Sequence, residues 1–452
     1  MNQVQVVLVN PANDIESASA EPLGIEYIAA YLRSNGVATA IVDEILEKHP
    51  LKKIADLGPR IVGITAATPV VNRAYEIADQ CRAMGMKTVI GGVHAAIFPQ
   101  EAIKHCDIVV TGDGEEAMLS IARGTIKEGI IDSGAIKDIE NLPLPARDLV
   151  DIEYYFDLVG NRWFFGEGKR TAIIISSRGC PYRCTFCHNF HRKYPVRYNS
   201  AEKVIEETKL IMSKYGIQSI FFIDDDFIGN KRRFLEIADL FEKERIKIRW
   251  ACNSRTNHIT EEIIERAHAI GCTHISFGIE SGSQQVLDAL NKRTTVEQNS
   301  AAIRICKKYG IKVMGSMMIG NPGETDEDLQ RTEKFIKENP IDFVGLCFTT
   351  PFPGTGLWDY CIENNLFPSV VNWDNFSTSR PKLDFAPNAA MKYEEIVAWY
   401  NRIDNLIENK KQKLPIGWAV RVALRSPIKT MQQMYRSRKR LSRYIKRLAF
   451  NR

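Results

Sequence analysis

Three cysteines, Cys180, Cys184 and Cys187, lie within eight residues of one another in the stretch "SSRGCPYRCTFCHN". One loop with C-x₃-C-x₂-C spacing can turn each thiolate toward a different iron of a single cluster, and the fourth iron is then left for a ligand that is not protein. A zinc site would need four ligands, and His188 and His191 are close enough in sequence to keep that alternative open. A disulfide would use two thiols and leave one over. The spacing alone leaves an iron–sulfur cluster and a zinc site both open.

The first third of the chain alternates apolar strand patterns with amphipathic helical ones, which predicts a doubly wound parallel sheet. The strand patterns lie at residues 4–9, 37–43, 61–68, 87–92 and 106–116. Ligands of such sheets bind beyond the carboxyl ends of the strands. The residues expected at those ends include Thr65, Thr68, Gly91, Gly92, His94 and Gly112. Gly-Gly after a strand is also ordinary turn chemistry, and no G-x-G-x-x-G follows the first strand, so a nicotinamide cofactor is not indicated.

The cysteine loop, with Phe186 directly before its last cysteine, resembles the signature of the radical S-adenosylmethionine superfamily. The apolar run 171–176 precedes the loop as the first strand of that family's partial (β/α)₆ barrel would. Five more strand patterns follow, at residues 217–227, 249–256, 274–283, 313–325 and 343–355. The resemblance implies a [4Fe–4S] cluster held by the three cysteines. S-adenosylmethionine would chelate the open iron and be cleaved to a 5′-deoxyadenosyl radical.

The same resemblance implies contacts to S-adenosylmethionine in the barrel. The residues concerned are Phe186, Asp225, Asp226, Glu280, Ser281 and Met318. Ser316 and Met318 stand where the family usually has Gly and Ile, so the adenine contact is expected through the backbone. Asp225 and Asp226 follow an apolar strand and would otherwise be solvated turn residues.

The stretches "GITAAT", "VIGGVHAAIFPQEA" and "VVTGDGEE" resemble the cobalamin-binding Rossmann-like domain that precedes many radical S-adenosylmethionine enzymes. The resemblance implies that the six strand-end residues named above flank cobalamin. The D-x-H-x-x-G motif that supplies a lower cobalt ligand in many cobalamin proteins is missing, so no such side chain is named. His94 is expected near the ligand edge and not on the cobalt.

These resemblances together imply methylation of an unactivated carbon of a small-molecule or lipid-like substrate, with a flavodoxin or ferredoxin as electron donor. A cyclase, dehydratase or other rearrangement enzyme, with or without cobalamin, is the alternative. A cobalamin sensor without catalysis is disfavoured by the intact cysteine loop. The sequence names neither a catalytic side chain nor the substrate or the oligomeric state.

We predict five regions along the chain. They are a cobalamin-binding domain (1–140), a linker (141–170), the barrel (171–355), a cap (356–408) and a basic amphipathic helical tail (409–452). The tail holds fourteen Lys or Arg and no acid, whereas the other 408 residues hold 46 basic and 55 acidic side chains. Such a helix could pack on the barrel or lie on an anionic membrane, and nucleic acid is not expected because no recognition module accompanies the charge.

The composition predicts a cytoplasmic protein. Ten cysteines with a single cluster do not form a disulfide framework, and neither a signal peptide nor a long uncharged apolar stretch is predicted. The basic tail adds peripheral contact with the inner membrane face to this expectation.

Overall fold

The computed structural model describes residues 3–12, 20–162, 170–188, 194–369, 371–376, 383 and 385–411. Both sheets of the protein lie in one compact unit, Met1–Tyr400. The predicted basic tail falls outside the described residues except for its first three positions. No helix among the described residues has both the length and the apolar character needed to cross a membrane.

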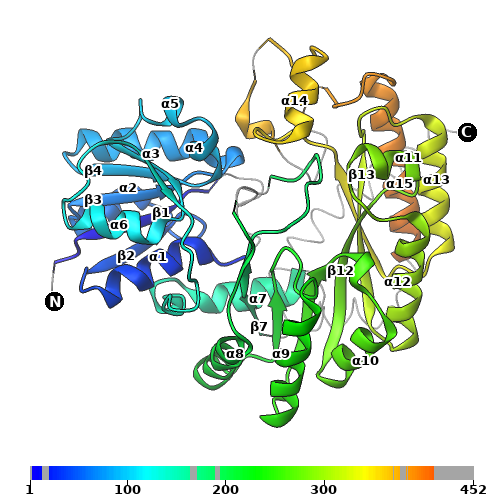
Figure 1. Cartoon of the computed structure of the whole chain (residues 1–452). Helices are drawn as coiled ribbons and strands as arrows, with labels where there is room; N and C mark the ends of the chain where they lie inside the picture. The colour runs from blue at the N-terminus through cyan, green and yellow to red at the C-terminus, as the bar shows by residue number, and fades with distance from the viewer. Residues whose placement is uncertain are drawn as a thin grey trace, which may run out of the picture. The chain divides into compact units, whose positions relative to one another are not determined.

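The N-terminal domain is a six-stranded parallel sheet of order β2-β1-β3-β4-β5-β6 (Figure 1). Its strands are β1 (Val6–Asn10), β2 (Thr39–Asp43), β3 (Ile61–Thr65), β4 (Lys87–Gly91), β5 (Ile108–Gly112) and β6 (Gly129–Gly134). Its helices are α1 (Leu23–Ser34), α2 (Pro50–Leu57), α3 (Val71–Ala83), α4 (Val93–Ile97), α5 (Pro99–Ala102) and α6 (Gly114–Ala122). The doubly wound prediction is confirmed, and α2 and β6 are elements that the sequence patterns missed.

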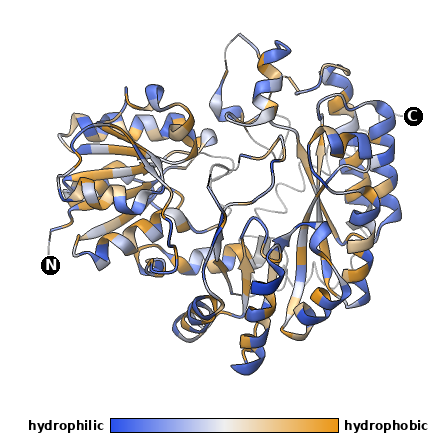
Figure 2. Ribbon diagram, viewed as in Figure 1, coloured by the Kyte–Doolittle hydropathy of each residue, from blue (hydrophilic) through white to orange (hydrophobic). Residues whose placement is uncertain are grey.

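Alternation along the strands divides the core of this domain between two faces. Val7 and Val9 of β1 pack with α2, α3 and α5. Val6 and Leu8 of the same strand pack with α1 and α6 on the opposite face. Both faces are therefore covered, which explains why the strands read as continuous apolar runs; they are coloured mostly hydrophobic in Figure 2.

The second domain is a six-stranded parallel sheet of order β14-β13-β12-β11-β10-β7. Its strands are β7 (Thr171–Ile174), β10 (Ser219–Phe222), β11 (Arg249–Ser254), β12 (Cys272–Glu280), β13 (Lys312–Ile319) and β14 (Phe343–Phe348). The short strands β8 (Ser177–Arg178) and β9 (Arg197–Tyr198) form a separate antiparallel pair. All six predicted barrel strands are present in the predicted order, which confirms the partial barrel.

Helices connect the barrel strands and follow them. They are α7 (Ile152–Arg162), α8 (Ala201–Tyr215), α9 (Lys231–Lys243), α10 (Glu261–Ala269), α11 (Gln284–Ala289), α12 (Val296–Lys308), α13 (Asp326–Glu338), α14 (Gly356–Glu363) and α15 (Tyr393–Lys411). Side-chain caps begin several of them; Thr295 and Thr325, for example, form capping boxes at α12 and α13. These crossovers place the carboxyl ends of all six strands at one edge of the barrel.

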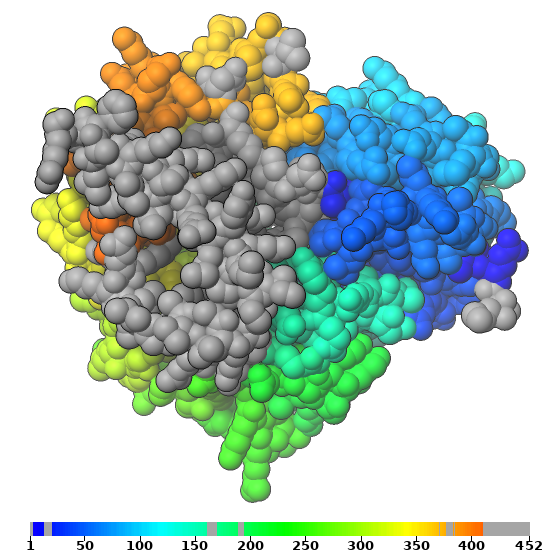
Figure 3. All heavy atoms as spheres, turned by 180° about the vertical axis from the view of Figure 1, so that it is seen from behind, coloured from blue at the N-terminus to red at the C-terminus, as the bar shows by residue number. Residues whose placement is uncertain are grey.

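A buried arginine in the linker joins the two domains. Arg147 pairs with Glu21, just before α1, at 3.1 Å and with Glu207 of α8 at 2.8 Å, and it donates to the Ile173 carbonyl of β7 at 2.8 Å. In the view from behind, the turquoise atoms of this part of the chain lie between the blue N-terminal atoms and the green barrel atoms (Figure 3). Burial raises the pKa of Glu21 and of Glu207, and Arg147 opposes that rise.

Arg147→Met is expected to lower the free energy of unfolding by about 3–5 kcal/mol, because it leaves buried carboxylates without their cation. Arg33→Met is the matched control: Arg33 pairs with Asp148, but both side chains are nearly half exposed, at 44% and 46%. Its loss should therefore cost no more than about 1 kcal/mol. Chemical denaturation of both variants and the wild type measures the two differences.

The loss in Arg147→Met should also depend on pH. A carboxyl group whose pKa is raised in the folded state stabilises the fold below its unfolded value of 4.5, and that contribution disappears as pH rises through the folded value. Without the arginine the pKa of both glutamates rises further. The difference in free energy of unfolding between variant and wild type should thus be larger at about pH 8 than at about pH 5. Equal differences at the two pH values would contradict this account.

Candidate functional site

A cavity of roughly 450 Å³ lies at the carboxyl ends of the N-terminal strands and reaches the cysteine loop of the barrel. Its N-terminal wall includes Thr65, Gly91 and Gly112 at the ends of β3, β4 and β5. Its barrel wall includes Cys187 and Asp225. The two predicted cofactor regions therefore open onto one space, which is where ligands of doubly wound sheets bind.

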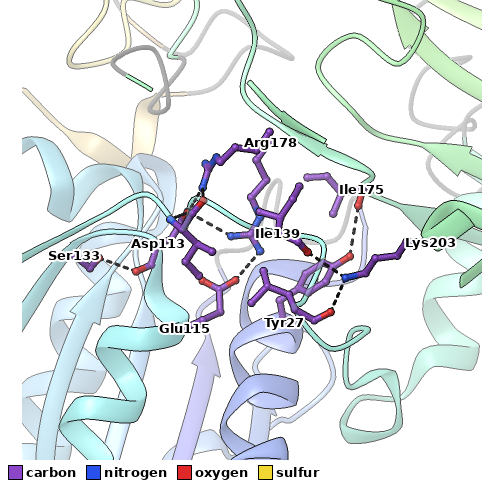
Figure 4. A network of polar contacts seen from close by, with 11 residues as sticks. Tyr27, Asp113, Glu115, Ser133, Ile139, Ile175, Arg178 and Lys203 are labelled. Carbon is purple, nitrogen blue, oxygen red and sulfur yellow. Dashed lines mark hydrogen bonds and ion pairs between the residues drawn. The ribbon is translucent and has the colours of Figure 1, made fainter. Parts of the chain in front are cut away.

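Ion pairs across this cavity tie the cysteine loop to the end of β5. Arg178, two residues before Cys180, donates to Glu115 at 2.6 Å and lies 3.4 Å from Asp113 (Figure 4). Arg197 pairs with the other oxygen of Asp113 at 2.5 Å. Burial alone would raise the pKa of Asp113, but the two guanidinium groups hold it below its usual value. Asp113 is therefore a carboxylate that bridges two arginines of the barrel.

The cysteine loop is held mainly through its backbone. Thr185 donates its N–H to the Leu290 carbonyl at 3.0 Å and accepts from the Leu357 N–H at 3.0 Å. The side chain of Asn291 donates to the Arg183 carbonyl at 2.7 Å. Cys184 is buried, Cys180 is half-buried and Cys187 is exposed toward the cavity, and none of the ten cysteines, all of which are described, forms a disulfide. These contacts position the loop without occupying its thiol groups as disulfides.

Within the described ranges, no group of three His, Cys, Asp or Glu side chains converges on a point where one ion would bind. A cluster does not require such convergence, because each thiolate meets a different iron. The zinc alternative thus has no site among the described residues, which do not include His191.

Three successive acids follow β10 and take three different roles. Asp224 is fully buried and accepts from the Ser176 N–H at 3.2 Å and from the Ser176 hydroxyl at 2.9 Å, so it fixes the base of the cysteine loop. Asp226 accepts from the Ser254 hydroxyl at 3.0 Å and pairs with His258 at 2.8 Å. Asp225 alone lines the cavity. Loss of surrounding solvent and the neighbouring acids raise its pKa. Of the two acids predicted to meet S-adenosylmethionine, only Asp225 points into the open space.

Glu280 ends β12 with φ of +66°, a conformation that only a few non-glycine residues adopt. Its carboxylate pairs with Lys292 at 2.7 Å, and both side chains are buried. The Lys292 ammonium also lies 5.6 Å from the ring centre of Phe186, in the cysteine loop. Backbone strain at a buried ion pair beside the cysteine loop is typical of a functional position. Lys292 is a candidate site residue that the sequence analysis missed, although it lies nine residues after the strand pattern 274–283.

The remaining predicted S-adenosylmethionine contacts are buried. The Ser281 hydroxyl lies 3.1 Å from that of Thr332 on α13 and accepts from the Ser283 N–H at 3.1 Å, so it is engaged within the protein. Met318, near the end of β13, is largely buried, and its carbonyl accepts from the Asn321 side chain at 3.0 Å.

The six predicted cobalamin residues fall into two groups. Thr65, Gly91, Gly92 and Gly112 line the cavity. Thr68 and His94 do not, since the buried His94 ring hydrogen-bonds to Thr68 at 3.2 Å. The ring also packs against three aromatic side chains: Tyr75, Phe98 and Trp373. Burial lowers the pKa of His94, which favours its neutral form. Its contacts are those of a core residue.

The glycines at the strand ends are required first by the chain itself. Gly92 has φ of +101°, and a Cβ there would lie 2.9 Å from the backbone of Ala66. At Gly112, with φ of +133°, a Cβ would lie 2.4 Å from the Gly134 carbonyl oxygen. Neighbouring backbone thus approaches both positions too closely for a side chain, whether or not a ligand binds beside them. Gly24 on α1 differs, because it lines the cavity and a Cβ there would meet nothing within 4 Å.

Comparison with known proteins gives two family matches. Residues 174–336 match the radical SAM superfamily, and residues 17–122 match the B12 binding domain. An uncharacterized methyltransferase of Pyrococcus horikoshii is 31% identical over 84% of this chain and 88% of its own length. The anaerobic magnesium-protoporphyrin IX monomethyl ester cyclase of Rubrivivax gelatinosus is 27% identical over 78% of this chain and 69% of its own.

The fold also matches a solved structure. The radical S-adenosylmethionine methyltransferase TsrM of Kitasatospora setae, solved with cobalamin and a [4Fe–4S] cluster bound, superposes with a TM-score of 0.64 at 18% identity. The match covers 79% of this chain and 75% of that one. At this identity the match establishes the shared fold.

Gly24→Phe is expected to weaken cobalamin binding without unfolding the protein, because the new side chain enters open cavity space. An overpacking cost of about 1–3 kcal/mol corresponds to a Kd raised roughly 5- to 140-fold. Gly24→Ala adds only a methyl group and should bind as the wild type does. Titration followed by cobalamin absorbance measures both. Full binding by a folded Gly24→Phe protein would place the cofactor elsewhere.

Proposed function

Because the chain belongs to the cobalamin-binding radical S-adenosylmethionine enzymes, we propose that it transfers a methyl group to an unactivated carbon of a small-molecule or lipid-like substrate. The observation that carries this proposal is the single cavity that joins the strand ends of the cobalamin domain to the cysteine loop. When bound, the cluster and S-adenosylmethionine supply a hydrogen-abstracting carbon radical, and cobalamin supplies the methyl group.

The residues of the chain then have positioning roles. We assign Cys180, Cys184 and Cys187 to the cluster. Glu280 and Asp225 are assigned to the polar groups of S-adenosylmethionine, with Lys292 holding the Glu280 carboxylate in place. Apolar side chains such as Leu23, Ile25 and Val93 line the same cavity and exclude water from it. Exclusion of water protects a reactive carbon radical from side reactions.

The ion pairs between Arg178 and the acids Asp113 and Glu115 support the transfer by fixing distance. They connect the loop that carries the cysteines directly to the strand end beside the proposed cobalamin site. A methyl group can pass to a substrate carbon only if the two cofactors face the same substrate at close range. We also propose a flavodoxin or ferredoxin as the source of the electron that the cluster requires.

Anaerobically reconstituted protein with cobalamin, a chemical reductant and methyl-labelled S-adenosylmethionine tests the proposal. The wild type should form 5′-deoxyadenosine and S-adenosylhomocysteine and should add one labelled methyl group to a compound in small-molecule or lipid extracts. Cys184→Ala should form no 5′-deoxyadenosine. Cys106→Ala, which removes a buried thiol of the other domain, should retain the activity. If 5′-deoxyadenosine forms but no labelled product or S-adenosylhomocysteine appears, a cyclase or another rearrangement enzyme replaces the methyltransferase.

For the basic tail, residues 409–452, we propose peripheral binding to an anionic membrane, which would suit a lipid-like substrate. Each basic side chain near such a surface contributes on the order of 1 kcal/mol, and salt screens that attraction. Full-length protein should therefore float with anionic vesicles at low salt and less so at high salt, whereas a 1–408 truncation should not. Equal flotation of the two proteins would exclude the tail as the membrane contact.

A further inference from the structure

A guanidinium group contacts the buried cysteine of the loop. Arg255 follows the end of β11, and its Nη1 donates to the Cys184 Sγ at 3.4 Å. The arginine is 6% exposed and the cysteine 5%. A cationic donor therefore lies within hydrogen-bond distance of the Cys184 thiol inside the protein.

The contacts of Arg255 keep its guanidinium group in this place. Its other terminal nitrogen, Nη2, donates to the Lys292 carbonyl, and its Cζ lies 3.7 Å from the ring centre of Tyr182. Stacking on an aromatic face and fixed donors are the means by which arginine is held in one geometry. The guanidinium group is therefore organised before any cofactor binds.

The Tyr182 ring is itself fixed. Its hydroxyl lies 2.7 Å from Nε2 of His258 and accepts from the Asn257 side chain at 3.0 Å. His258 in turn lies 2.8 Å from the Asp226 carboxylate. A line of contacts thus runs from the acid after β10 through His258 and Tyr182 to Arg255. Asp226 does not line the cavity, and its contact with His258 instead helps to hold Tyr182 in position.

We propose that Arg255 is a positioning residue that raises the reduction potential of the iron–sulfur cluster. The reduced cluster carries one more negative charge than the oxidised one. A permanent cation with an N–H···S hydrogen bond to a ligand sulfur stabilises that form more strongly, and burial of both groups limits screening. In this one-electron step the cluster gains the electron and a low-potential donor of the flavodoxin or ferredoxin class loses it, with no proton transferred. The inference depends on the cluster assignment and not on methyl transfer.

The experiment is a redox titration of reconstituted full-length protein without substrate, followed by the paramagnetic signal of the reduced cluster. Arg255→Met removes the charge and the hydrogen bond, and Arg255→Gln keeps an N–H donor without the charge. Arg255→Lys keeps the charge but lacks the planar guanidinium group. Arg266→Met is the matched control, because Arg266 pairs with Glu242 and Asp239 on the outside of the same barrel.

For Arg255→Met we expect a more negative midpoint, by about 59 mV for a roughly tenfold change in the one-electron equilibrium constant. Arg255→Gln should shift the midpoint part of the way, and Arg266→Met should not shift it. If Arg255→Met does not retain iron, the midpoint potentials of the Gln and Lys variants test the proposal. If charge tunes the potential, the midpoint of Arg255→Lys must lie closer to that of the wild type than the midpoint of Arg255→Gln does. If the cluster-loaded Met or Gln variant has the midpoint potential of the wild type, the proposal is wrong. This holds even if the variant binds S-adenosylmethionine more weakly, because Arg255 would then contact that ligand without tuning the cluster. As no substrate enters the titration, failure of the proposed methyl transfer would leave this result unaffected.

Discussion

The open edge of β7 is the constraint on which the junction of the two domains depends. β7 is the last strand of the barrel sheet, and among the described strands its one partner is β10. The Ile174 carbonyl accepts from the Ile223 N–H on that paired side. The carbonyl groups of the residues before and after Ile174 point to the opposite side of the strand. There the Ile173 carbonyl accepts from Arg147, and the Ile175 carbonyl accepts from the Tyr27 hydroxyl at 3.4 Å. An unpaired strand edge is costly to bury, so the linker and α1 provide the missing donors.

Covering this edge places a cluster of charges in the interior. Arg147 has two carboxylate partners, Glu21 and Glu207, and Glu26 of α1 is fully buried nearby with neither oxygen hydrogen-bonded. Burial raises the pKa of Glu26 well above its usual value, with Glu21 adding to the rise. One cation cannot offset three buried carboxylates, so burial favours the protonated form of Glu26. The junction is therefore polar and holds more carboxyl groups than cations.

Much of the fold could be predicted because its signals are local in the sequence. Both parallel sheets follow from apolar runs between amphipathic helices, and the three cysteines lie within eight residues of the chain. The contacts that join the domains or hold the cysteine loop are not local: Arg178 lies 63 residues from Glu115, and Arg255 lies 71 from Cys184. The spacing of apolar residues along the sequence does not predict contacts between side chains so far apart in the chain. His94 shows the same limit, since "GGVH" reads as a ligand edge, whereas the short helix α4 directs the ring into the core.

The residues that follow β7 also position the cysteine loop. The chain leaves β7 with Ser176 bound through its N–H to Asp224 and through its carbonyl to Arg233 at 3.0 Å, so the direction of the following residues is fixed from the barrel side. Arg178, two residues later, is fixed from the cobalamin-domain side by Asp113 and Glu115. The cysteine loop begins immediately after these two anchors, one from each domain. A displacement of either domain would have to break buried charged contacts, and for this reason the distance between the cysteine loop and the N-terminal strand ends is a property of the fold and not of the ligands that occupy the cavity.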